Sequence, residues 1–415
     1  MQLLLVLVFL GTGILSYATQ RFPMPEFESA YTHPDTLQPS GRAEFMQIVD
    51  VMVLLLALSV VSWLVIKKRS RKGVFAASLF SLLYFGFYRE GCVCSIGAIQ
   101  NVTLALFNDW YTIPVSAMLF FLLPLFFTLF FGRTFCAGVC PLGALQDLVA
   151  FRPQKLGTAL KSILGLIPFL YLGFAVLYAA TGTDYIICRY DPFVGFFRFN
   201  ASFGMFVFGG TLLLSGVFIA RPYCRFLCPY GVLLNWVSRL SVKHITITPS
   251  VCIQCKLCED SCPFEAINIP VITKNPVPKK KMIQKFMISL VMIPVLILAL
   301  GFLGSRMNER FALVHPHVAL AKEIMDQGKV KVQTESQSIK AFKSSGKPAS
   351  EVFAEATVII EKFRTGGWIL GGFIGLVLGI MISRGFLHRY NPDYVPNKGT
   401  CLSCTRCVDF CPVKA

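Results

Sequence analysis

Charged side chains are scarce in this sequence. Asp, Glu, Lys and Arg together make up 15% of the 415 residues, whereas hydrophobic residues make up 55% and the mean hydropathy is +0.63. This composition excludes a soluble globular protein, because too few polar residues are present to cover its surface. Acidic residues are scarcer than basic ones, with 22 Asp and Glu against 39 Lys and Arg. The net charge of +17 fits contact with anionic lipid headgroups or ordinary topology signals.

Several motifs of hydrolytic chemistry are also missing from the sequence. It has no Gly-rich phosphate loop, no nucleophile elbow and no His-Glu-x-x-His zinc motif. These absences argue against a nucleotide hydrolase, a serine hydrolase and a zinc peptidase. We also expect no nucleic-acid partner.

Long apolar stretches are abundant, so we expect a polytopic membrane protein that is mainly α-helical. A spanning helix needs about 20 predominantly apolar residues. The segments that approach this pattern are residues 1–18, 47–66, 74–88, 111–131, 162–180, 203–220, 284–304 and 367–383. The first lacks the charged start of a secretory signal, so we expect a retained helix that acts as a signal anchor.

Cysteine is the most informative residue type that is present. One spacing, Cys-x2-Cys-x2-Cys-x3-Cys-Pro, occurs twice, in a first box at residues 252–263 and a second box at residues 401–412. The eight cysteines are Cys252, Cys255, Cys258, Cys262, Cys401, Cys404, Cys407 and Cys411. A disulfide framework or a zinc site is the alternative, but zinc sites usually join two separate Cys-x2-Cys knuckles. The spacing is typical of bacterial ferredoxins and predicts two [4Fe-4S] clusters as cofactors.

The positive-inside rule orients the chain. The basic run at residues 67–72 marks a cytoplasmic loop, and alternate counting from it places both boxes on the cytoplasmic side. The cytoplasm also keeps thiols reduced. Two spans separate the boxes, so the sequence predicts a ferredoxin-like 2[4Fe-4S] module that is split by a transmembrane helical hairpin.

In ferredoxins the fourth cysteine of each box often ligates the other cluster. One predicted set is Cys252, Cys255, Cys258 and Cys411, and the other is Cys401, Cys404, Cys407 and Cys262. Residues 264–269 suit a short strand after the first box. Only residues 413–415 follow the second box, so its matching strand is missing and uncrossed ligation stays open.

A second cysteine pattern repeats at predicted helix ends. Cys136 and Cys140, followed by Pro141, recur 88 residues later as Cys224 and Cys228, followed by Pro229. On a helix this spacing puts two thiols on neighbouring turns of one face, and we expect the proline to end or kink that helix. Packing of small residues is the structural alternative to a redox role or to further Fe-S binding.

A partial third copy contains Cys92 and Cys94 in a predicted outer loop. Ligation together with a partner such as Cys188 and plain packing are equal alternatives there. In the same region Trp110, Tyr111, Phe193, Phe196 and Phe197 either line a quinone site or form an interfacial aromatic belt.

Together, the paired Cys-x3-Cys-Pro segments and the ferredoxin-type boxes on a multispanning chain resemble the NosR/NapH family of membrane 4Fe-4S electron-transfer proteins. The resemblance covers about residues 74–269 and the second box. It implies a bacterial cytoplasmic membrane protein that relays electrons between the quinone pool or cytoplasmic donors and a periplasmic acceptor, in the manner of a quinol dehydrogenase subunit. It also implies that the repeat cysteines occupy the places of the family's membrane-edge cysteines.

This chain departs from the family in two respects. It has no Ser/Thr-Gly-Ala-Thr signature for covalent flavin, so a separate flavoprotein or periplasmic reductase is the expected partner. A helical hairpin also separates the boxes, and its outer loop at residues 305–366 reads as short amphipathic helices. His315 and His317 in this loop are either ligands of haem or metal, or part of a plain turn.

Three functions compete on this reading. The first is the electron-transfer subunit just described. The second is a metal reductase that reduces copper for oxidase assembly, as the similar CcoG branch suggests. The third is a redox-sensing or scaffolding membrane protein without turnover.

The sequence also predicts five domains or segments. They are residues 1–46 (N-terminal helix and outer loop), 47–245 (membrane core), 246–283 (first box), 284–383 (hairpin) and 384–415 (second box).

Overall fold

The computed structural model describes most of the chain. The described residues are 43–91, 94–109, 111–151, 153–247, 252–270, 279–329, 336–344, 346, 348–386 and 393–413. Nearly all regular structure among them is helical, as the composition predicts. The predicted span at residues 1–18, and Cys92 and Trp110, lie outside the described residues.

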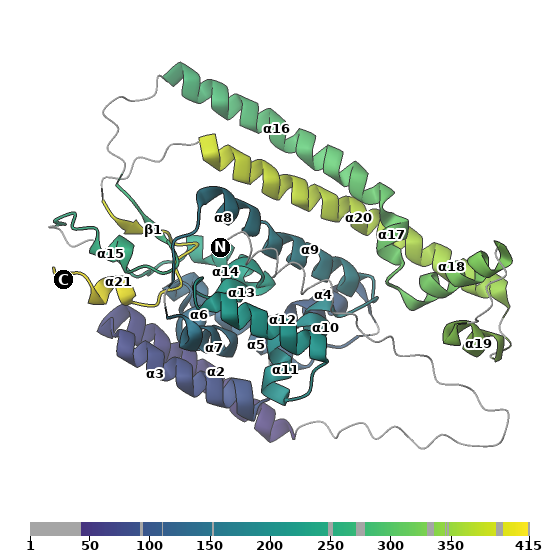
Figure 1. The fold of residues 1–415 in the computed structure, drawn as a ribbon, viewed down its shortest axis with the longest axis horizontal. Coiled ribbons are helices and arrows are strands. Elements are labelled where there is room, and N and C mark those ends of the chain that lie inside the picture. Colours follow the sequence, from purple (N-terminus) through teal and green to yellow (C-terminus); the bar gives the residue numbers. More distant parts are fainter. Residues whose placement is uncertain are drawn as a thin grey trace.

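The helices before the first box form the body of the molecule (Figure 1). Its first elements are α2 (Glu44–Trp63), the π-helical turn η1 (Leu64–Lys68), α3 (Arg71–Ser81), the π-helical segment η2 (Leu82–Tyr88), α4 (Ala98–Phe107), α5 (Val115–Phe131), α6 (Thr134–Gly138) and α7 (Pro141–Val149). They are followed by α8 (Thr158–Leu164), α9 (Ile167–Ala180), α10 (Ile186–Tyr190), α11 (Pro192–Arg198), α12 (Phe203–Gly216), α13 (Pro222–Phe226) and α14 (Pro229–Arg239).

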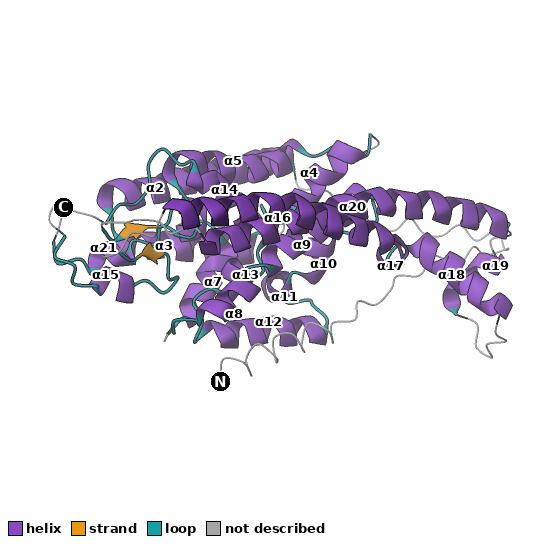
Figure 2. Ribbon diagram, turned by 90° about the horizontal axis from the view of Figure 1, so that it is seen from above, coloured by secondary structure: helices purple, strands orange, loops and turns teal. Residues whose placement is uncertain are grey.

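The remaining elements alternate between the boxes and the hairpin. They are α15 (Leu257–Asp260), β1 (Ile267–Asn268), α16 (Lys279–Arg306), α17 (Asn308–Ala312), α18 (Pro316–Lys329), α19 (Gln337–Ser344), α20 (Ala349–Phe386), β2 (Val395–Pro396) and α21 (Arg406–Asp409). Figures 1 and 2 show α15, β1 and α21 together at one end of the elongated molecule and α18 and α19 at the other.

Within the described part of the chain, four helical segments are long and apolar enough to cross a membrane, namely residues 44–68, 158–180, 284–306 and 349–383. A fifth results if α11 and α12, which meet at 106°, count as one bent span. The expectation of eight spans is therefore confirmed only in part. The segment predicted at 111–131 forms α5, which has 17 residues because Pro114 precedes its first turn.

Helix α3 and its continuation η2 nevertheless run from one end of the body to the other. Arg71 at the start of α3 lies beside the second box, where it donates to the carbonyl oxygen of Cys404 at 3.5 Å. Arg89, just after η2, pairs instead with Asp50 near the start of α2 at 2.9 Å. We call the end that contains Arg71 and the second box the box end of the body, and the end that contains Arg89 and Asp50 the far end.

Helices α16 and α20 pack as a close antiparallel hairpin along one side of the body (Figure 1). A Cβ atom added at Gly367, Gly371 or Gly375 of α20 would collide with main-chain atoms of α16. This four-residue spacing of glycines lets two helix backbones approach closely, as in other membrane helix pairs. Helix α20 also begins well before the predicted span at 367–383, because residues 349–366 continue it against α17 and α18.

We predict that Gly371→Ala destabilises the hairpin by about 1–3 kcal/mol, because its new methyl group would meet the carbonyl of Leu300. Gly372→Ala is the matched control, since a Cβ atom there lies 3.6 Å from the side chain of Ile297. Thermal unfolding of the purified variants in detergent measures the difference. Equal melting temperatures for the two variants would contradict the close packing.

Candidate iron-sulfur and thiol site

The two boxes meet although a long hairpin separates them in the sequence. Strand β1 follows the first box and pairs antiparallel with β2, with Ile267 opposite Pro396 and Asn268 opposite Val395. The partner strand thus precedes the second box, whereas the sequence analysis looked for it after that box. A strand of two residues beside a proline gives no recognisable sequence pattern.

Both boxes have the same backbone conformation. Gln254 and Lys256 in the first box have positive φ angles of 52° and 63°, and Ser403 and Thr405 in the second have 54° and 63°. Non-glycine residues adopt this conformation rarely, so the match at equivalent positions indicates one shared loop structure. The short helices α15 and α21 follow at equivalent positions in the two boxes.

The eight box cysteines line two separate pockets, four in each. The first pocket is lined by Cys252, Cys255, Cys258 and Cys411, and the second by Cys262, Cys401, Cys404 and Cys407. Each pocket therefore takes three cysteines from one box and the last cysteine of the other. Apolar side chains complete the walls, with Ile247 and Tyr394 at the first pocket and Ile245 and Phe264 at the second.

The two pockets differ in their exposure. At the first pocket Cys255 is exposed and Ile253 keeps 61% of its surface accessible. At the second pocket Leu402 and Ser403 are buried against the body, and burial raises the pKa of the Cys401 thiol to about 12. The first pocket therefore faces outward, and the second lies against the helical body.

Among the described residues, no three His, Cys, Asp or Glu side chains are arranged to hold a single metal ion. This finding includes the box cysteines. A cubane differs from a single ion because each thiolate binds its own iron atom. The two four-cysteine pockets therefore suit clusters better than single metal ions.

The Cys-x3-Cys-Pro repeats form two short helices that meet end to end. Helix α6 ends before Cys140, and Pro141 begins α7; α13 and α14 repeat this arrangement around Cys228 and Pro229. The expectation that both cysteines of a repeat lie on one helix was wrong, because Cys136 lies in α6 whereas Cys140 caps α7. The cysteine helix does end ahead of Pro141, and this proline starts the next helix, where its missing N–H group costs nothing. Cys228 precedes α14 and its thiol accepts from the Gly231 N–H at 3.3 Å.

The two repeats are interlocked by arginines at equivalent positions. A Cβ atom at Gly143 would lie 3.1 Å from Arg221, and one at Gly231 would lie 3.4 Å from Arg133. Each arginine thus packs on the glycine of the other repeat. Both are buried, with Arg133 5% and Arg221 0% exposed.

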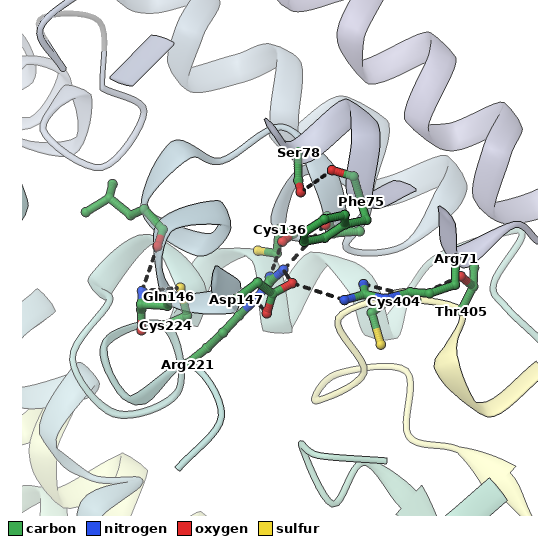
Figure 3. Close-up of polar contacts among 12 residues, drawn as sticks. Arg71, Phe75, Ser78, Cys136, Gln146, Asp147, Arg221, Cys224, Cys404 and Thr405 are labelled. Atoms are coloured by element: carbon green, nitrogen blue, oxygen red, sulfur yellow. Dashed lines mark hydrogen bonds and ion pairs between the residues drawn. The ribbon is translucent and has the colours of Figure 1, made fainter. Parts of the chain in front are cut away.

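Asp147 is the centre of this buried network (Figure 3). Arg221 donates to its two carboxylate oxygens at 2.8 and 2.7 Å, and Arg71 approaches it at 3.5 Å. Burial alone raises the pKa of Asp147, but the Arg221 guanidinium outweighs that effect and the net shift is downward. Arg221 also donates to the carbonyl oxygens of Cys136 and Ala137.

The repeat thiols accept hydrogen bonds from the same network. Arg133 lies 3.6 Å from the Cys136 Sγ and donates to the Gly399 carbonyl, just before the second box, at 3.2 Å. Gln146 donates to the Cys224 Sγ at 3.3 Å. Burial, followed by the neighbouring thiols Cys224 and Cys136, raises the pKa of Cys140. The four repeat cysteines are thus neighbours in the structure, which the sequence analysis did not predict, and a bound cofactor there stays a prediction.

The arginines, Asp147 and Gln146 were not selected from the sequence. The sequence nevertheless contains a pattern that could have identified them. Arg133 and Arg221 occupy the same position of the repeat, and Gln146 and Asp147 are the last residues of its first copy.

The remaining candidate residues lie farther from the boxes. Cys94 and Cys188 line one cavity at the far end of the body. In that region Asp191, whose carboxylate accepts from the Phe193 N–H, has its pKa raised to about 6 by burial. Of the predicted aromatic set, Phe197 lines an adjoining pocket.

The other aromatic and histidine candidates make packing or surface contacts. Phe193 packs on Tyr223, Phe196 packs on Phe206, and Tyr111 donates to Asn101. At the start of α18 the ring of His317, which is 54% exposed, pairs with Glu355.

Two different family models match the chain, one over the two repeats and the other over the first box. A family model described as a 4Fe-4S binding domain matches residues 113–159 and 201–248, which contain the two Cys-x3-Cys-Pro segments. A second 4Fe-4S binding domain model matches residues 245–268. No solved structure matches the chain.

Several curated proteins are similar to parts of the chain. Protein NirI of Paracoccus denitrificans is 31% identical over 224 residues, which is 50% of this chain and 32% of NirI. The putative electron transport protein YccM of Escherichia coli is 27% identical over 40% of this chain and 52% of YccM. Regulatory protein NosR of Pseudomonas aeruginosa is 27% identical over 53% of this chain and 33% of NosR. The matches thus span from a third to half of these relatives.

The helical body, its candidate membrane spans and the matched domains define a membrane iron-sulfur protein of the electron-transport class. Within this class the chain is similar to NirI and to NosR, which agrees with the resemblance that the residue pattern had already indicated.

We predict that Asp147→Asn lowers the stability of the protein by about 3–5 kcal/mol, because it leaves the buried Arg221 guanidinium without its counter-charge. Asp260→Asn is the control. Asp260 is 66% exposed and pairs with Lys155 at the surface, where an ion pair contributes little. Thermal unfolding of both variants measures the effect. Equal stability would show that the Asp147 pair does not hold the repeats together.

Proposed function

We propose that the protein relays electrons across the membrane through two [4Fe-4S] clusters held by the box cysteines. The observation that carries the proposal is the division of eight thiols into two pockets of four. This is the crossed arrangement of two-cluster ferredoxins. In it, Cys252, Cys255, Cys258 and Cys411 hold one cluster, and Cys401, Cys404, Cys407 and Cys262 hold the other.

The residues around the pockets fit such clusters. Cysteine thiolates are the usual cluster ligands, and burial with nearby hydrogen-bond donors sets the potential of a cluster. The Ser403 N–H donates to the Cys401 Sγ at 3.4 Å, and the Ala266 N–H donates to the Cys262 Sγ at the same distance. When bound, the clusters supply one-electron redox chemistry, and the chain contributes the ligands, the dry surroundings and the placement.

The ferredoxin-like module is split by the hairpin of α16 and α20 and faces the cytoplasm. The basic run at residues 67–72 lies at the box end, since Arg71 contacts Cys404 and Arg69 lies 3.5 Å from Thr246. A cluster of basic residues beside a span marks the cytoplasmic side. The box end is therefore the cytoplasmic end in our proposal, and the far end faces the periplasm in the inner membrane.

The exposure of the two pockets and their contacts with the repeats suggest the order in which electrons pass between them. The outward-facing first pocket is the point of exchange with cytoplasmic donors, and the second pocket lies next to the repeats. A cavity of about 210 Å³ lies between the second pocket and the repeats. Cys224 and Cys228 of the second repeat line it together with Thr400 and Leu402 of the second box region. The repeat cysteines then continue the route toward Cys94 at the far end. The partners we propose there are the quinone pool and a periplasmic acceptor or flavoprotein.

The crossed ligand sets predict a specific pattern of iron loss. The wild-type chain should bind about eight irons, and a variant in which Cys252, Cys255 and Cys258 are all serine should keep about four. Adding Cys411→Ser to that variant should remove no further iron, because Cys411 belongs to the cluster already lost. Adding Cys262→Ser should reduce the iron below four or convert the signal to a three-iron species. Iron and acid-labile sulfide analysis with electron paramagnetic resonance measures each step.

The opposite pattern would overturn the crossed arrangement. If Cys411→Ser removes the remaining iron and Cys262→Ser does not, each box holds its own cluster. If anaerobically purified wild-type protein contains no iron, the electron relay itself is wrong.

A further inference from the structure

The cavity between the repeats and the second pocket has cationic walls that an electron relay does not require. It encloses about 210 Å³, and we call it the basic cavity. Arg133, Lys161 and Arg225 line it, and none of the described residues around it is acidic. A space of this size holds about seven waters at about 30 Å³ each, so a phosphate group fits inside it.

The basic cavity carries more positive than negative charge. Lys161 and Arg225 both pair with the carboxylate of Glu265, at 3.2 and 3.3 Å. Arg133 contacts a carbonyl oxygen and a thiol instead of a carboxylate. Three cations thus share one carboxylate, which leaves two positive charges at the cavity. Buried charge is costly unless a counter-charge lies nearby, so the cavity favours an anion.

The hydrogen bonds of Arg133 are a second, independent observation. This side chain is 5% exposed, and its guanidinium donates to the Gly399 carbonyl at 3.2 Å. Its Nε–H has no hydrogen-bond partner among the described residues. Nearly all buried donors in proteins have a partner. An anion in the cavity that Arg133 lines would offer an acceptor oxygen, and arginine suits phosphate oxygens well.

Other walls of the basic cavity are apolar and border a membrane span. Pro168 and Phe169 line it from α9, which belongs to the candidate span at residues 158–180. The ring of Phe169 packs on Trp236, with centroids 6.1 Å apart, and Trp236 is 41% exposed. Tryptophan is enriched where a membrane meets water. The cavity therefore adjoins the level at which phospholipid headgroups lie.

We propose that the basic cavity binds a phosphate group, which comes either from the headgroup of an anionic phospholipid or from phosphate in solution. Basic pockets between membrane helices on the cytoplasmic side bind anionic headgroups. Arg133, Lys161 and Arg225 contact the phosphate oxygens. The bound ligand joins α9 to Thr400 and Leu402 beside the second box. The inference goes beyond the electron relay, because it needs neither cluster.

Removal of one charge tests the site. Lys161→Gln should weaken the binding of dioleoylphosphatidylglycerol to the delipidated full chain in detergent by about tenfold, the loss expected for one charge-assisted hydrogen bond. Lys155→Gln is the matched control, because Lys155 lies on the preceding loop and pairs with Asp260 at the surface. Isothermal titration calorimetry measures both affinities. Equal affinities for the two variants would overturn the site.

An added negative charge tests the same cavity in the opposite way. Thr400 lines the cavity and is exposed, so a larger side chain there should not prevent folding. Thr400→Glu should abolish binding, because its carboxylate repels the phosphate. Thr400→Gln has nearly the same shape without the charge and should keep measurable binding. The melting temperature without ligand checks that both variants are folded. If they bind equally well, charge does not select the ligand and the proposal is wrong.

A series of ligands separates the two sources of phosphate. Dioleoylglycerol has the same chains without the phosphate, and inorganic phosphate is titrated against chloride at matched ionic strength. Binding of phosphatidylglycerol alone assigns the cavity to a lipid headgroup, whereas equally tight binding of inorganic phosphate assigns it to phosphate in solution. Binding of neither, or equal binding of dioleoylglycerol, would overturn the phosphate site. Iron analysis of the same samples tests the relay separately.

Discussion

The buried ion pair between Arg221 and Asp147 is the interaction on which the rest of the structure depends. It joins the second Cys-x3-Cys-Pro repeat to the first, since the two residues come from different copies. Arg71 extends the same network to the carbonyl of Cys404. One buried carboxylate thus fixes the two repeats and the second box relative to one another. A relay needs this fixed placement, because electron transfer slows steeply as the distance between centres grows.

The same arginines also balance negative charge. Thiolates and reduced clusters are anionic, and a buried charge without a partner is costly. Arg133 and Arg221 bring two buried cations beside the repeat thiols, and Asp147 offsets one of them. The net positive charge that remains favours an added electron near the membrane core. Arginine suits this role because its guanidinium stays charged when it is buried.

The sequence predicted the elements that have a fixed local spacing. The box cysteines, the 88-residue repeat and the hydrophobic spans at 47–66 and 284–304 can each be recognised within a short window. Strand β2, the link from Arg71 to Asp147 and the extension of α20 before residue 367 could not be predicted in this way. They depend on contacts between distant segments, and a single sequence gives no pairing information for those. The span count was confirmed only in part, because α5 and α12 are apolar but short, the segment at 74–88 is divided between α3 and η2, and residues 1–18 lie outside the described residues.

The inserted hairpin constrains how the protein is assembled. With the proposed ligand sets, each cluster takes cysteines from both sides of α16 and α20. The first pocket is incomplete until Cys411 arrives, and the second has only Cys262 until the hairpin has returned to the box end. Metal-site formation is coupled to folding when the ligands come from separate segments. In the proposed arrangement, cluster insertion would therefore follow insertion of the hairpin into the membrane, and the clusters would then hold together two segments that the pairing of β1 with β2 had already joined.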